Sequence, residues 1–387
     1  MADSKKIMQI NSALVALLVC ANPIAWVAKG GALPVICAFC LFCIILVNRK
    51  ISFPTIILFT GLTFVFLISS TLKDNINNTY FDNYSRSIFT LGLTGFICGQ
   101  IDFDVKSVFR NIALFGVVFI AFTYRLDMGS AEDGTADYGN WMGISYGILR
   151  IIDGLTIYGL FYSFKTKHKA IFLSVACAYL CFLLIYGSRG TLLAYGTLLF
   201  YCWIINKRYG FKQFLKRLLI IAIPFILIYF YFFDILLWLH NISQVLDVKL
   251  FFVEKLIALE EIGNISSGRS ELIESAIPSI INSPFFGNGI ATFEPYHDGY
   301  VHNLFIQVLF ELGIIPFILV CSIIFLGLKN IVDLRINKGH RLFIVYLISS
   351  GVVELLFSSS LWVSQVFWLY SGYIVRLNLN KKKYYVT

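Results

Sequence analysis

The chain has 387 residues, of which 58% are hydrophobic, 17% aromatic and 14% charged. Soluble domains carry about 25% charged residues. Here the charges lie in gaps between apolar runs that are long enough to cross a bilayer, which takes about 20 helical residues. This pattern excludes a string of soluble domains. The net charge of +9 does not indicate nucleic acid, because the basic residues sit in short segments between the runs. The sequence predicts an all-α, polytopic transmembrane helical bundle.

Twelve apolar segments are predicted to span the membrane: residues 7–28, 31–47, 51–72, 86–101, 107–124, 141–163, 169–187, 190–205, 217–239, 301–328, 341–357 and 361–376. With the N-terminus in the cytoplasm, 22 of the 31 Lys and Arg residues fall in inside segments and 8 in the longer outside segments. Basic residues accumulate in cytoplasmic loops, so this distribution predicts that both termini are cytoplasmic.

The predicted organisation has three parts. Residues 1–239 hold the first nine membrane helices, residues 240–300 form one long outside loop, and residues 301–387 hold the last three helices and a cytoplasmic tail. The first half of the loop, at 242–259, mixes apolar and charged residues as helices on a membrane surface do. We therefore expect interfacial helices in this loop.

Two spacings in the sequence superficially suggest metal sites. Cys37, Cys40 and Cys43 have an iron–sulfur-like spacing, but they lie within a predicted membrane helix without a further ligand nearby, so we interpret them as core residues. Asp102 and Asp104 have the spacing of a metal-binding Asp-x-Asp pair, but they fall on the cytoplasmic side in the predicted topology. The sequence thus predicts neither a bound metal nor another cofactor.

Three polar features converge on the predicted outer face. Arg189 lies in a tight Gly-Ser-Arg-Gly turn between two helices, Arg269 follows Gly268 and opens a helix, and His302 with Asn303 begins the tenth span. Arginine guanidinium groups bind phosphate oxygens bidentately, and a histidine at this boundary is suited to take a proton from a hydroxyl group. Taken one by one, these residues also fit a helix-end charge, a solvated loop residue and an interfacial anchor.

Charged residues inside the predicted spans are candidates for a second role. Arg150 and Asp153 are three residues apart on one helix, which suits either a self-neutralising salt bridge or substrate binding, since buried charge in a membrane is costly. Glu311 and Glu354 are interpreted as structural or as buried neutral groups. Both alternatives for Arg150 and Asp153 stay open from the sequence alone.

Several stretches resemble one family when they are taken in order. They are Tyr-Gly-Ser-Arg-Gly-Thr-Leu-Leu-Ala from 186, Ser-Gly-Arg-Ser from 267, Ser-Pro-Phe-Phe-Gly-Asn-Gly from 283 and Val-His-Asn-Leu-Phe-Ile-Gln-Val-Leu-Phe-Glu-Leu-Gly from 301. Together they resemble the bacterial O-antigen polymerase and O-antigen ligase superfamily, whose members are multi-span membrane glycosyltransferases. One departure is Ile314-Ile315-Pro316 after Gly313, where the family commonly has a small residue.

The resemblance implies a GT-C-like helical fold in the bacterial inner membrane, with a periplasmic active site and a long periplasmic loop. It implies that Arg189 and Arg269 hold the pyrophosphate of an undecaprenyl-pyrophosphate-linked oligosaccharide donor, that His302 activates the acceptor hydroxyl, and that Asn303 lies beside it. The implied partners are the lipid-linked donor and acceptor, the bilayer and a chain-length regulator, without nucleic acid. No cofactor is implied.

The segment 355–372, which is rich in Ser and Trp, is more similar to the polymerases than to the ligases. The sequence therefore favours a polymerase that joins repeat units into O-antigen or a related surface polysaccharide. The alternatives are an O-antigen ligase, which transfers the chain to lipid A-core, and a flippase or transporter for lipid-linked sugars. A transporter is expected to carry its polar groups near the membrane midplane, whereas most of those here lie toward one face.

Overall fold

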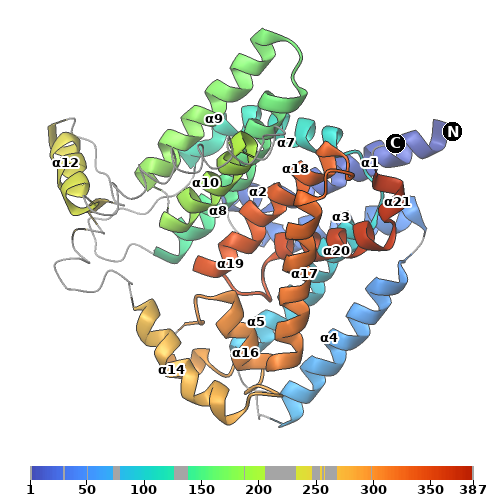
Figure 1. Ribbon diagram of the computed structural model, residues 1–387, viewed down its shortest axis with the longest axis vertical. Coiled ribbons are helices and arrows are strands. Elements are labelled where there is room, and N and C mark those ends of the chain that lie inside the picture. Colours follow the sequence, from blue (N-terminus) through green and yellow to red (C-terminus); the bar gives the residue numbers. More distant parts are fainter. Residues whose placement is uncertain are drawn as a thin grey trace.

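Long apolar runs without Pro or Gly breaks form helices, because a helix satisfies its own backbone hydrogen bonds inside a membrane. The computed structural model describes residues 2–28, 31–49, 51–72, 79–125, 138–186, 188–204, 232–245, 253–254, 257, 268–297 and 299–385. Within these ranges the regular structure is helical, apart from an isolated antiparallel bridge between Ile336 and Tyr385. The helical class is confirmed (Figure 1).

The first half of the described chain contains α1 (Ala2–Val19), α2 (Ala21–Ala28), α3 (Ala32–Asn48), α4 (Phe53–Leu72), α5 (Thr79–Ser87), η2 (Ile88–Gly92), α6 (Leu93–Gln100), α7 (Val105–Phe119), η3 (Ile120–Arg125), α8 (Tyr138–Ile157), η5 (Tyr158–Tyr162), α9 (Thr166–Tyr186) and α10 (Arg189–Ile204). The second half contains α12 (Phe232–Val245), α14 (Arg269–Asn282), α15 (Glu294–His297), α16 (Leu304–Leu312), α17 (Ile314–Val332), α18 (Lys338–Leu347), η6 (Ile348–Val352), α19 (Val353–Phe357), α20 (Gln365–Leu379) and α21 (Lys381–Tyr384). The segments η2, η5 and η6 are π-helical turns within longer helices.

Six described helices are long and apolar enough to cross a membrane, and a seventh span is possible if α1 and α2, which are bent by 54°, form one. The protein is therefore a helical membrane protein, but the predicted count of twelve spans is not confirmed by the described residues. Most of the predicted span 217–239 and of the loop helix at 242–259 lies outside them. The three-part division and the GT-C-like arrangement stay predictions.

The predicted span 301–328 is wrong as a single helix. The chain forms α16 and then α17, and the break falls at Gly313, where φ is +79° and favours glycine. A side chain at Gly313 would overlap the carbonyl of Phe285, and the N–H of Ile314 donates to the Pro284 carbonyl at 2.9 Å. The Gly-Ile-Ile-Pro departure from the family pattern therefore marks the start of α17, with Pro316 in its first turn.

The predicted span 361–376 also begins in the wrong place. The helix α20 begins at Gln365, because the Ser364 side chain accepts from the N–H of Phe367 and caps it. The residues between α19 and α20, Ser358–Ser364, form a non-helical segment that we call the serine turn. Within it, Ser358, Ser360 and Trp362 are buried.

The most extensive helix pair in the described part of the chain is α6 with α20. Gly95 and Gly99 lie four residues apart on α6, and a Cβ at Gly99 would fall 2.6 Å from the Leu369 carbonyl oxygen. A Cβ added at Gly372 of α20 would likewise overlap the backbone of Phe96. Small residues at this spacing let two helix backbones approach each other in a membrane, and this crossing fixes α20 in the interior.

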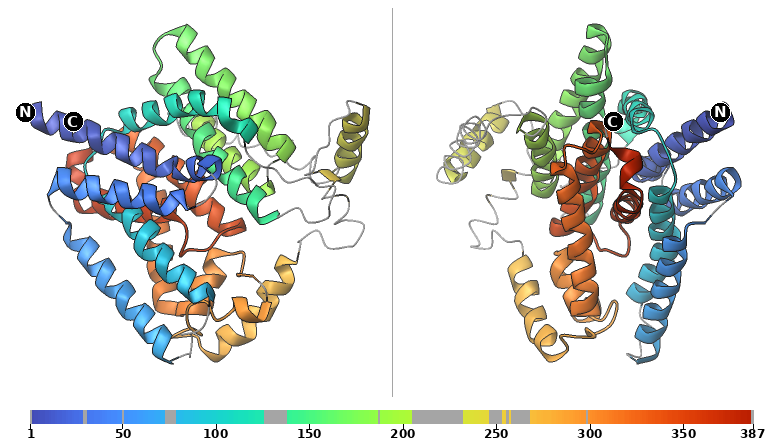
Figure 2. Two further views of the ribbon diagram at one scale, coloured as in Figure 1. Left: turned by 180° about the vertical axis from the view of Figure 1, so that it is seen from behind. Right: turned by 45° about the vertical axis from the view of Figure 1, so that its right-hand side comes forward.

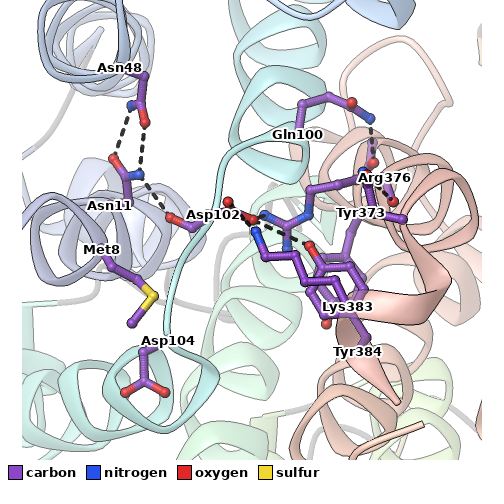
Figure 3. A network of polar contacts seen from close by, with 12 residues as sticks. Met8, Asn11, Asn48, Gln100, Asp102, Asp104, Tyr373, Arg376, Lys383 and Tyr384 are labelled. Carbon is purple, nitrogen blue, oxygen red and sulfur yellow. Dashed lines mark hydrogen bonds and ion pairs between the residues drawn. The ribbon is translucent and has the colours of Figure 1, made fainter. Parts of the chain in front are cut away.

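The two chain termini lie together at one end of the molecule, and α14 lies at the opposite end (Figures 1 and 2). At the terminal end, Asp102 forms ion pairs with Lys383 at 2.6 Å and with Arg376 at 3.7 Å, as Figure 3 shows. Asp104 instead caps α7 by accepting from Ser107. The two aspartates therefore have separate structural contacts, far from α14.

We expect Gly99→Ala to destabilise the protein, because the added methyl group separates α6 from α20; overpacking of this kind costs about 1–3 kcal/mol. Gly196→Ala on α10 is the matched control, since a Cβ there meets no atom within 4 Å. Thermal unfolding of the detergent-solubilised variants measures the difference. Equal midpoints for the two variants would contradict the close-packed crossing.

Candidate functional site

Arg189 is placed by the start of α10. The Ser188 side chain accepts from the N–H of Thr191 at 3.3 Å, so the preceding residue caps the helix and fixes Arg189 in its first turn. The next position, 190, is a glycine because there is little space for a side chain. A Cβ there would overlap the Tyr146 hydroxyl group and lie 3.0 Å from the Cβ of Phe357. Arg189 itself is half-buried.

Arg269 is the first residue of α14, and Gly268 before it has a φ of +78°. The helix is held in place by an apolar face, on which Ala276 is fully buried against Phe293, Val301 and Phe310. Because Val301 directly precedes His302, the same small core sets the position of both α14 and the histidine.

His302 lies in a bend just ahead of α16, where the Asn303 N–H donates to the Val301 carbonyl at 2.6 Å. The Asn303 side chain accepts from the N–H groups of Phe305 and Ile306, so it caps α16 and holds the histidine at the helix entrance. The ring of Tyr300 lies beside the imidazole, with 4.3 Å between ring centroids. The His302 Nδ1 atom is buried and has no hydrogen-bond partner among the described residues. One ring nitrogen thus has unused capacity for a proton or a hydroxyl group.

Arg269 connects the three predicted residues electrostatically. Burial, and then the positive charge of Arg269, lower the pKa of Arg189. The same two causes lower the pKa of His302 to about 4. Arg269 therefore acts electrostatically on both of the other residues, although they lie on three separate elements. At neutral pH the site combines two cations with a neutral imidazole, a combination that suits an anionic substrate with a hydroxyl group beside it.

Of the two alternatives for Arg150 and Asp153, the salt bridge between them is not formed. Arg150 pairs with Glu354 of α19 at 2.8 Å, and its side chain is only 1% exposed. Asp153 is fully buried next to Ser349. The π-helical turn η6 packs against α8, and Glu354, two residues after this turn, binds the guanidinium group although it is 204 residues away. The sequence spacing alone predicts the wrong partner.

Three site residues were not predicted from the sequence. Tyr146 lies against Ser188 and Gly190, and Tyr300 lies against His302 and accepts from the N–H of Ser359 at 2.6 Å. Glu354 lies close enough to act electrostatically on both tyrosines. Tyr300 stands two residues before His302, which was the only available signal in the sequence.

The family model described as O-antigen ligase matches residues 170–321. This stretch contains Arg189, Arg269 and His302. The match supports membership in the O-antigen ligase and polymerase superfamily. No curated protein matches the chain. Membership in this superfamily implies lipid-linked oligosaccharide substrates and a membrane setting.

Arg150 and Glu354 both lie outside the matched stretch 170–321, and we expect their ion pair to be structural. Glu354→Ala leaves a bare buried cation and should destabilise the protein by about 3–5 kcal/mol. The double variant Arg150→Met/Glu354→Leu removes both charges and should recover most of that loss. The readout is the thermal midpoint of the purified protein. A double variant no more stable than the single one would show that the charges themselves are not the cause.

Proposed function

We propose that this protein is a membrane glycosyltransferase that polymerises undecaprenyl-pyrophosphate-linked repeat units into O-antigen or a related surface polysaccharide. The observation that carries the proposal is that Arg269 acts electrostatically on both Arg189 and the neutral His302. The distribution of basic residues supports a periplasmic site in the bacterial inner membrane, with cytoplasmic termini. A chain-length regulator is a further proposed partner.

In the proposed reaction, an acceptor sugar hydroxyl attacks the anomeric carbon of the donor. The new glycosidic C–O bond forms as the bond from the anomeric carbon to the pyrophosphate oxygen breaks. The hydroxyl proton passes to a ring nitrogen of His302, and the electron pair of the broken bond leaves on undecaprenyl pyrophosphate. Arg189 and Arg269 stabilise the negative charge that grows on the leaving group.

The remaining predicted site residues support this core in the proposal. Asn303 holds His302 at the entrance of α16 through its cap, since its side-chain oxygen is already engaged there. Arg150 and Asp153, which we expected to bind substrate, are both buried, and Arg150 is paired with Glu354. We propose that they act from beneath the site, by fixing α19 against α8.

The ligase alternative has one specific observation in its favour, because the matching family model is described as O-antigen ligase. The polymerase is favoured by the serine- and tryptophan-rich segment at 355–372. Both enzymes need the same pyrophosphate leaving group and the same activated hydroxyl. They differ in the acceptor, which is a growing lipid-linked chain for a polymerase and lipid A-core for a ligase.

A strain that carries only His302→Ala separates the two activities. We expect lipopolysaccharide core bearing a single repeat unit, because a separate ligase still transfers unextended donor. Bare core, with long chains retained on the polyprenyl carrier, would instead identify the ligase. The readout is one gel of extracted lipopolysaccharide, with an immunoblot to show stable expression. A normal ladder would contradict both glycosyltransferase proposals and favour transport.

The pH dependence of the purified enzyme should reflect His302, which must be neutral to accept a proton. Because its pKa is lowered to about 4, activity should persist in acid and fall only as the pH approaches 4. Arg269→Gln removes the nearby positive charge, so the pKa should rise and the acid limb should move to higher pH. It should stay below 6.5, since burial is the larger cause.

Arg269→Lys is the matched control for this shift, because it keeps the positive charge and so should keep the acid limb where it is. Both variants should lose rate, since neither offers the bidentate guanidinium fork. An acid limb that is identical in all three proteins would show that His302 is not the group that titrates.

A further inference from the structure

One short segment touches both halves of the candidate site. Phe357, the last residue of α19, packs against Gly190, next to Arg189. Two residues later, the N–H of Ser359 donates to the Tyr300 hydroxyl at 2.6 Å, and the Tyr300 ring lies beside His302. Within three residues, the chain therefore contacts Gly190, the neighbour of Arg189, and Tyr300, whose ring lies beside His302.

The segment is fixed from the side of α16. Gln307 donates to the Ser360 hydroxyl at 2.7 Å and accepts from the N–H of Leu361 at 3.2 Å. One helical turn further on, Glu311 accepts from the Trp362 indole N–H at 2.7 Å. Gln307 and Glu311 are four residues apart and so lie on one face of the helix. This face binds the serine turn at three consecutive residues.

The segment is also fixed from the side of α8. Glu354, three residues before Phe357, pairs with Arg150, and the Tyr146 hydroxyl one turn earlier on α8 lies against Ser188 and Gly190. Ser359 has a φ of +69°, a conformation that is uncommon for a residue other than glycine. Such backbone persists only where the surrounding contacts determine it. These contacts hold the serine turn in a single shape.

We propose that Tyr300 is a positioning residue, through which the serine turn sets His302 at the correct distance from Arg189. The Tyr300 hydroxyl is held by Ser359, and the ring then fixes the plane of the imidazole beside it. The inference rests on the proposed function, since it assigns a role to the geometry of the same site. It predicts that the hydroxyl group of Tyr300 matters for turnover and not for substrate affinity.

The test compares Tyr300→Phe with Tyr296→Phe, a control in the same segment whose ring is 84% exposed. The substrate is the lipid-linked repeat unit extracted from a strain that lacks the gene, and kcat and KM are measured on the purified full chain. We expect Tyr300→Phe to lower kcat about ten- to hundredfold, as a small misplacement of a catalytic group does, with KM unchanged. Tyr296→Phe should match the unaltered protein.

A second pair of variants tests the turn without altering Tyr300. Ser359→Gly keeps the N–H donor and favours the observed φ, whereas the β-branched side chain in Ser359→Val is strained there. We expect Ser359→Val to show the low kcat of Tyr300→Phe and Ser359→Gly not to show it. The double variant Tyr300→Phe/Ser359→Val should be no slower than either single variant, because both remove one interaction.

Two outcomes would overturn the inference. An unchanged kcat in Tyr300→Phe, with His302→Ala inactive, would show that the histidine needs no such support and would leave the proposed function standing. A raised KM with kcat unchanged would make Tyr300 a substrate-binding group. Full activity in His302→Ala would be a failure of the proposed function itself, so the two failures are distinguishable.

Discussion

Non-helical backbone inside a membrane protein needs a partner for every N–H and carbonyl group, and only surrounding protein can supply it there. In the serine turn, the N–H groups of Ser359 and Leu361 donate to Tyr300 and Gln307, and the Trp362 indole donates to Glu311. Each partner belongs to the segment that carries His302. The hydrogen bonds that satisfy the backbone of the serine turn therefore also fix the segment that carries His302. The architecture of the site depends on these bonds.

Buried charged side chains also depend on their partners. Arg150 and Glu354 neutralise each other where neither could remain charged alone. Arg189 and Arg269, in contrast, lie near each other with like charge. Like charges held close together raise the free energy of the empty site, and in the proposed function a doubly charged pyrophosphate relieves that repulsion on binding. Part of the affinity of such a site for an anion therefore comes from the repulsion between its two arginines in the folded protein.

Hydropathy predicted a helix well where the apolar run begins and ends close to the helix itself. The predicted segment 51–72 is α4, from Phe53 to Leu72, and the predicted 169–187 is close to α9. It failed at 301–328, because a moving average of hydropathy does not detect one glycine with positive φ between two apolar helices. It failed again at 361–364, where an apolar, Trp-containing stretch is buried without being helical.

The sequence singled out some residues of the candidate site and missed others. Arg189, Arg269 and His302 stand out because arginine and histidine are uncommon in such an apolar chain. Tyr300 is one of 21 tyrosines, and only its place two residues before His302 marks it. The partner of Arg150 was unpredictable for another reason, since the choice between Asp153 and Glu354 depends on how two distant helices meet.

The π-helical turn η6 has a consequence for the length of the chain. Tyr346, before this turn, donates its hydroxyl to the Arg150 carbonyl, and Glu354, after it, binds the Arg150 side chain. At about 100° per residue, positions eight apart on an α-helix point about 80° away from each other, and the wider turn brings both toward α8. A homologue with one residue fewer between 348 and 352 would turn Glu354 aside and leave a cation alone in the interior. The pairing of Arg150 thus depends on the number of residues in this segment as well as on the acid itself.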